Sequence, residues 1–119
     1  MDVITAIASK ALDGLYVRQS AIAQNVANAG AESYSPVRVE FEEQLRQALD
    51  ATATATPADA LARVAQVQPE LRTVPLLPGQ RVKLDQEITN ASETSARYAM
   101  LIGMLNRSLQ SQMRAIRGG

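Results

Sequence analysis

The N-terminal part of the chain carries hydrophobic residues at helical spacing. Apolar positions follow one another in alternating steps of four and three, and Gln19 is the one polar break. Asp2 precedes the pattern as a candidate N-cap, and Gly30 follows it where a left-handed C-terminal stop is expected. The pattern predicts a helix over 2–29. Its apolar seam consists of Ala8, Leu12, Leu15, Ile22, Val26 and Ala29.

The C-terminal part shows the same alternation over a longer stretch. Positions 84–116 keep steps of four and three without a slip, which is typical of one seam of a coiled coil. Asp85 and Glu87 suit the positive start of such a helix, and Arg114 and Arg117 suit its negative end. We expect this helix to pair with the first one as a coiled-coil-like hairpin. Its seam consists of Leu84, Ile88, Ala91, Ser95, Tyr98, Ile102, Leu105, Leu109, Gln112 and Ile116.

The middle of the chain follows neither pattern. Val37, Val39 and Phe41 alternate with charged residues, which indicates a short extended stretch, and helical spacing then suggests a short helix up to about position 50. An Ala-Thr run and most of the prolines interrupt regular structure after that point, leaving room for two helical turns over 58–67.

The expected fold is therefore all-α, with an irregular middle segment. We divide the chain into an N-terminal assembly helix (1–30), a turn with an extended stretch and a short helix (31–50), an Ala/Thr/Pro-rich linker or loose lobe (51–80), and a C-terminal assembly helix (81–119).

Helices of this length do not fit inside one small globule. A helix over 84–116 would be about 50 Å long, whereas a compact domain of this size has a radius of gyration of about 13.5 Å. Pairing the two helices would still leave flanking apolar side chains short of contacts, and each would forgo roughly 1.5–3 kcal/mol of burial. We therefore expect other copies or related chains to complete the burial. The flanking residues are Ile4, Ile7, Leu101, Met104 and Met113.

Composition excludes several classes of function. The 119 residues include no cysteine and no histidine, so thiol chemistry, zinc sites with nitrogen or sulfur ligands and histidine-based catalysis are excluded. Twelve basic and twelve acidic residues cancel, which gives no electrostatic footprint for nucleic acid. Glu42 and Glu43 are adjacent on an expected helix and diverge, while the acids at 85 and 87 are explained by the helix dipole. We expect no catalysis, no cofactor, no metal and no small-molecule substrate.

Targeting signals are also missing from the pattern. No stretch has the run of apolar residues that spans a bilayer, and the first residues lack the basic start and apolar core of a secretory signal. The expectation is a soluble protein made in the cytoplasm, which would need another export machine to reach any other compartment.

Two asparagines lie close to the end of the otherwise apolar first helix, where they lower its helix propensity. A frayed C-terminus would explain Asn28 alone. Asn25 and Asn28 together favour a specific bond from side chain to backbone that fixes how the chain leaves the helix.

These residues resemble the N-terminal signature of the flagellar rod, hook and hook-associated family. The signature is an Asn-aliphatic-Ala-Asn core followed by a tyrosine and an alternating stretch. Within the family the chain is most similar to proximal rod subunits, and the sibling rod protein FlgC shares the N-terminal signature. Where the family commonly has Thr-Pro-Gly before the tyrosine, the chain has Ala-Glu-Ser at 31–33, which implies a looser loop. The residues that match this signature are Asn25, Ala27, Asn28 and Tyr34. Arg97 and Tyr98 match a Leu-Arg-Tyr pattern inside the family's C-terminal helix.

The resemblance implies a structural role in the bacterial flagellum. Such proteins stack their terminal helices into a tubular helical axle that crosses the periplasm, transmits motor torque and surrounds an export channel. The implied partners are copies of the chain, other rod proteins, a FliE-like adaptor and the membrane-embedded base, without a membrane span of its own. Export would follow the flagellar type III route without a cleavable signal peptide. The alternative from another class is a small coiled-coil adaptor or export chaperone.

Overall fold

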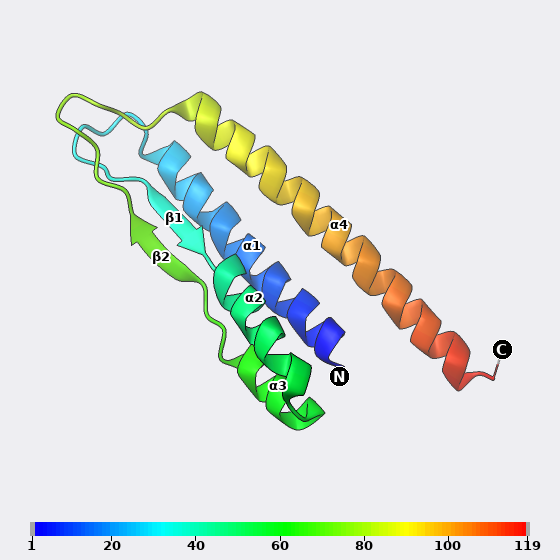
Figure 1. The fold of residues 1–119 in the computed structure, drawn as a ribbon. Helices are drawn as coiled ribbons and strands as arrows, with labels where there is room; N and C mark the ends of the chain where they lie inside the picture. Colours follow the sequence, from blue (N-terminus) through cyan, green and yellow to red (C-terminus); the bar gives the residue numbers. More distant parts are fainter. Residues whose placement is uncertain (1, 119) are drawn as a thin grey trace.

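Two long antiparallel helices form the frame of the molecule (Figure 1). In the computed structural model, which describes residues 2–118, α1 (Val3–Ala27) packs along α4 (Leu84–Ile116). The molecule extends 62 × 29 × 14 Å and has a radius of gyration of 17.9 Å, well above the value of about 13.5 Å for a compact domain. The predicted all-α fold with paired terminal helices is confirmed. The outermost residues of the predicted segments, positions 1 and 119, lie outside the described residues.

α1 begins as the sequence predicts and ends differently. The Asp2 carboxylate accepts a hydrogen bond of 2.7 Å from the backbone N–H of Thr5, so Asp2 is the N-cap. At the other end, both the backbone N–H and the side-chain amide of Asn28 donate to the carbonyl oxygen of Gln24, at 3.1 and 2.9 Å. Gly30 does not adopt a positive φ, so the predicted left-handed stop at this glycine is wrong. The Asn28 cap ends the helix before Gly30 is reached.

A two-stranded antiparallel ribbon connects the helices to the middle of the chain. β1 (Val37–Glu40) corresponds to the predicted extended stretch, and it pairs with β2 (Glu70–Thr73) in the register Val37 to Thr73 and Glu40 to Glu70. β2 lies within the region interpreted as a linker or loose lobe. All four of its residues are exposed. A strand with no buried face does not need alternating apolar and polar residues, so an alternating pattern could not indicate it.

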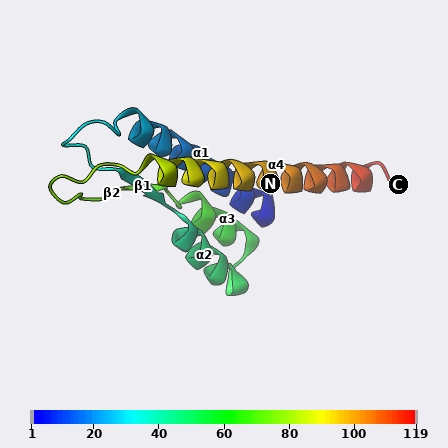
Figure 2. The same ribbon diagram turned by 90° about the horizontal axis from the view of Figure 1, so that it is seen from above.

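The rest of the middle segment forms a small helical lobe beside α1. α2 (Glu42–Ala51) leads through a single 3-10 turn, η1 (Thr52–Thr54), into α3 (Pro57–Ala65). α3 packs on both α1 and α2 through buried Ala60 and Val64. Figure 2 shows α2 and α3 projecting to one side of the helix pair, and it shows the end of α4 extending past the start of α1.

Phe41 anchors this lobe to α1. Its ring is buried directly against Gly14, where a Cβ atom would lie only 2.5 Å from the ring carbon Cδ1. The absence of a side chain at Gly14 therefore permits the close approach, although glycine disfavours a helix interior by about 1 kcal/mol. The surrounding core consists of Leu15, Ala21, Val39, Phe41, Leu45, Ala48, Val64 and Val67.

Candidate functional site

A buried cluster of polar side chains joins α1, β1 and α4. We call it the polar hub, and it consists of Asn25, Tyr34, Arg38 and Glu87. Asn25 is 0% exposed and Glu87 is 1% exposed, so both have lost their contact with water. Polar groups in such surroundings must find partners within the protein.

The Asn25 side chain hydrogen-bonds to the backbone of β1, as a neighbouring strand would. Its Oδ1 accepts hydrogen bonds from the N–H of Val37 at 2.8 Å and from the hydroxyl of Tyr34 at 2.9 Å, and its Nδ2 donates to the carbonyl of Val37 at 3.0 Å. The N–H of Val74, the residue after β2, donates to the carbonyl of Pro36 at 2.8 Å. The alternation of an antiparallel ladder therefore turns the backbone groups of Val37 away from β2. The expected bond that fixes the chain's exit from α1 is therefore present.

Glu87 brings α4 into the hub. Its Oε2 accepts from Asn25 Nδ2 at 3.1 Å, and its Oε1 lies 2.7 Å from Arg38 Nη2. From the sequence alone, Glu87 is explained by the helix dipole. It does lie in the first turn of α4, but its role as a buried ion-pair partner was missed because local sequence carries no signal for a partner 49 positions away.

The hub also affects Tyr34. Burial raises the pKa of its phenol, and the nearby Glu87 carboxylate raises it further, while Arg38 partly offsets both effects. The hydroxyl therefore remains protonated at neutral pH, as its bond to Asn25 requires.

A second polar contact fastens β1 and α2 to α1. The Arg18 guanidinium donates to the carbonyl of Val39 at 2.7 Å and to Glu42 Oε2 at 2.8 Å, and it lies 4.9 Å from the centre of the Phe41 ring. No motif or spacing in the sequence points to Arg18. The arginine is half-buried and joins three segments, so it positions the lobe relative to the helix pair.

The predicted seam residues divide into two groups. In the covered group, Leu15 and Ile22 are buried in the chain's own core, and the half-buried residues are Ala8, Leu12, Ala29, Ala91, Tyr98 and Leu105. The exposed group contains the polar residues Ser95 and Gln112 and the apolar residues Val26, Leu84, Ile88, Ile102, Leu109 and Ile116.

The exposed members on the last helix form what we call the α4 stripe, defined as Leu84, Ile88, Ile102, Leu109 and Ile116. Their exposed fractions run from 38% at Ile102 to 85% at Ile116. The face of α4 that packs on α1 is rotated from this stripe and carries Glu87, Thr94, Tyr98, Leu101 and Leu105. The alternating pattern therefore continues onto a surface that the chain itself does not cover.

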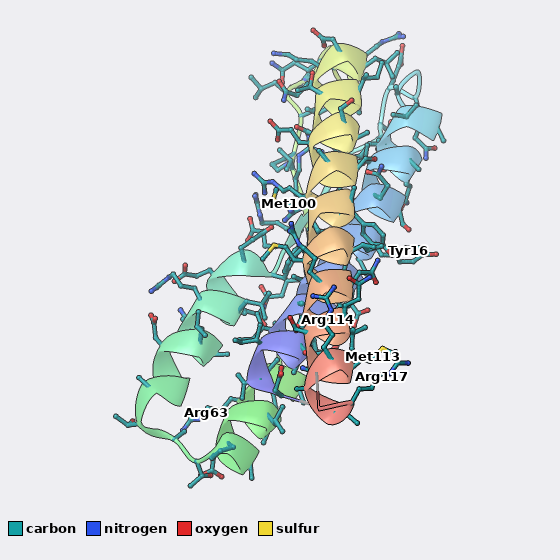
Figure 3. All side chains as sticks on the ribbon, turned by 90° about the vertical axis from the view of Figure 1, so that its right-hand side faces the viewer. Tyr16, Arg63, Met100, Met113, Arg114 and Arg117 are labelled. Atoms are coloured by element: carbon teal, nitrogen blue, oxygen red, sulfur yellow. The ribbon has the colours of Figure 1, made fainter. Side chains whose placement is uncertain are left out.

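Apolar grooves lie along both flanks of the contact between α1 and α4. One groove of about 570 Å³ is lined by Leu15, Tyr16, Tyr98 and Ile102 among others. The other, of about 400 Å³, lies beside α2 and includes Met100. Figure 3 shows Tyr16 projecting outward on one side of α4 and Met100 on the opposite side, above α2. These surfaces suit the burial of further helices and offer few groups for chemistry.

Within residues 2–118, no three or more acidic side chains converge as metal ligands would. None of the helices in that part of the chain combines the length and the apolar character needed to traverse a bilayer.

Comparison with known proteins bears directly on this arrangement. No family model matches the sequence. Two curated relatives, the flagellar basal body rod protein FlgB of Escherichia coli (strain K12) and that of Shigella flexneri, are each 29% identical over 116 residues. The match covers 86% of this chain and 84% of each relative. The chain is similar to these flagellar basal body rod proteins over most of its length. This similarity supports a structural protein of the flagellar rod, and the resemblance found in the sequence is confirmed.

The residues of the rod-family signature occupy different positions in the structure. Asn25 and Tyr34 belong to the polar hub, and Asn28 caps α1. Ala27 and Arg97 are exposed. The signature therefore marks the exit of the chain from α1 more than a surface for binding.

Proposed function

We propose that this rod protein assembles through α1 and α4, with copies of itself and with other rod proteins, into a tubular helical axle that transmits motor torque and surrounds an export channel. The α4 stripe is the observation that carries the proposal. Its apolar side chains run along a 33-residue helix and stay uncovered by the chain. Contacts that repeat head to tail without closing a ring generate a filament.

The finer parts of this proposal rest on the resemblance to flagellar rod proteins. A FliE-like adaptor and the membrane-embedded base would meet the rod at its proximal end, and the chain would reach the periplasm by the flagellar type III route without a cleavable signal peptide. The role is structural and not catalytic. Apolar grooves and a stripe of aliphatic residues support packing, and this is what the proposed axle requires.

Two substitutions in the α4 stripe test the proposal. Ile88 is 61% exposed and Ile102 is 38% exposed, so Ile88→Asp with Ile102→Asp should leave the fold intact while placing two charges in the contact between subunits. We expect swimming in soft agar to be lost when this variant replaces the chromosomal copy, with normal protein levels. Leu105 is half-buried against α1, so Leu105→Arg would also disturb the helix pair and is the less informative change.

The matched control places charge elsewhere on the same helix. Ser92→Asp lies on an exposed polar position of α4, outside the stripe, and we expect it to swim normally. Normal swimming of the Ile88/Ile102 variant would contradict the proposed interface.

A solution measurement separates the axle subunit from the small adaptor or export chaperone. Sedimentation equilibrium of the isolated chain should show a monomer at low concentration, because a contact that repeats without closing favours no oligomer of fixed size. A closed dimer or tetramer would favour the adaptor.

A further inference from the structure

The packing between α1 and α4 contains little information about how far one helix is shifted along the other. The face of α4 that packs on α1 repeats half-buried Ala91, Tyr98 and Leu105 at intervals of one heptad. A shift by one heptad, about 10 Å along the helix, brings apolar residues into contact again, although Ala, Tyr and Leu differ in size. Aliphatic packing alone therefore leaves the alignment weakly specified.

Among the described residues, three hydrogen bonds between side chains cross between the two helices in a single antiparallel alignment, and Gln19 also donates to the backbone carbonyl of Ala91 at 3.4 Å. Asn25 meets Glu87 at 3.1 Å, Gln19 meets Ser95 at 2.8 Å, and Asp2 meets Gln112 at 2.9 Å. The last two lie near the surface, where water replaces a lost partner at little cost. The contact at Glu87 is fully buried, and the same carboxylate pairs with Arg38.

We propose that Glu87 is a positioning residue that fixes the register of α4 on α1. Any shift of α4 takes its carboxylate away from Asn25 and Arg38 and leaves buried polar groups without partners, which is strongly unfavourable. Only one alignment satisfies all of them. A single buried polar contact that selects one register among several apolar ones is a well-attested device in coiled coils.

The register has a consequence for assembly, which rests on the proposed function above. With Gln112 opposite Asp2, the α4 residues that follow extend past the start of α1 (Figure 2). The overhang includes Met113, which is 52% exposed, and Ile116. A shift of one heptad would change the length of this overhang by about 10 Å and would misplace the α4 stripe for every subunit in the axle.

The chain has no cysteine, so engineered cysteine pairs report the register without interference. Gln19→Cys with Ser95→Cys reports the native alignment, and Gln19→Cys with Ile102→Cys reports α4 shifted by one heptad. Both pairs replace Gln19, so they are matched. The readout is the yield of intramolecular product with a short thiol cross-linker in dilute protein, measured by mass spectrometry.

The decisive variant moves the glutamate by one heptad, as Glu87→Leu with Thr94→Glu. In the parent chain we expect the native pair to react at least about tenfold more than the shifted pair. In the relocated variant we expect the preference to reverse, because the new glutamate meets Asn25 and Arg38 only when α4 moves. Glu87→Gln should keep the native preference, since its amide oxygen still accepts from Asn25.

Several outcomes would overturn the proposal. If the relocated variant keeps the native preference, the segment before α4 sets the register and Glu87 does not. If that variant loses its helical circular dichroism, Glu87→Leu with Arg38→Met takes its place, and a retained native preference there rejects the proposal. If both variants lose their helix, the polar hub is required for folding, and the proposal is again rejected. The experiment uses isolated protein, so its result is independent of whether the chain assembles as proposed.

Discussion

At the scale of single residues, the side chain of Asn25 connects several parts of the protein. Its amide bonds to the backbone of Val37, to Tyr34 and to Glu87, which uses all of its donors and two acceptor positions. The neighbouring Asn28 makes one side-chain bond, to the carbonyl of Gln24 in its own helix. Two asparagines that look equivalent in the sequence therefore differ greatly in what depends on them.

Substitution of these asparagines should separate their contributions. Asn25→Ala leaves several buried partners unsatisfied and should lower the free energy of unfolding by about 3–5 kcal/mol. Asn28→Ala removes one bond at a helix end and should cost no more than about 1 kcal/mol. Urea denaturation followed by circular dichroism measures both. Equal losses for the two variants would show that Asn25 has no special role.

Tyr34 gives the hub a pH dependence. Its pKa is raised in the folded state by burial and by Glu87, so folding favours the neutral phenol. The resulting stability is fully present below the unfolded pKa of about 10 and is lost as the pH rises through the folded pKa. Tyr34→Phe lacks this titration. We expect the difference in unfolding free energy between parent and variant to shrink as the pH rises above the unfolded pKa of about 10, and a constant difference would contradict the assignment.

At the scale of elements, the crossing of Phe41 over α1 decides where the lobe sits. The ring lies against Gly14, and Arg18 one turn later holds Val39 and Glu42. A glycine in a helix interior is normally a weak point. Here the glycine is the condition for close packing between two elements.

Two glycine-to-alanine substitutions test this point. At Gly103 of α4 a new Cβ would meet nothing within 4 Å, so Gly103→Ala should raise the unfolding free energy by about 0.5–1 kcal/mol through helix propensity. At Gly14 the new Cβ would lie 2.5 Å from the Phe41 ring. Gly14→Ala should therefore destabilise the protein by about 1–3 kcal/mol, as measured by thermal or urea unfolding. Stabilisation of both variants would mean that the ring moves freely.

At the scale of the whole molecule, the chain is a rod with incomplete burial. Its length of 62 Å and thickness of 14 Å leave few residues with neighbours on every side. Exposed apolar residues run along both helices, from Ile4 at 76% exposure to Ile116 at 85%. A surface of this kind is typical of a subunit whose burial is completed by its neighbours.

Small-angle X-ray scattering tests the overall shape. For the dilute isolated chain we expect a radius of gyration near the 17.9 Å of the structure, with concentration-dependent growth through the α4 stripe. A radius near about 13.5 Å, the value for a compact domain of this length, would mean that the long helices break into shorter ones that bury their apolar faces internally.

The sequence by itself determined the local features. Apolar spacing located α1 and α4, Asp2 was recognised as the N-cap, and alternation around Val37 and Val39 located β1. The paired asparagines predicted a bond from side chain to backbone, and Asn25 makes it. These features depend on neighbours within a few positions, and periodicity and capping record such neighbours directly.

Only the tertiary structure decided the rest. It places Glu87 in a buried ion pair, covers one face of α4 while leaving the α4 stripe exposed, and pairs β2 with β1 although β2 has no pattern of its own. It also ends α1 at an asparagine and not at Gly30. Each of these depends on groups that meet across tens of positions. A spacing rule says that a helix has an apolar face, but the partner that covers that face is fixed by contacts which the local sequence does not encode.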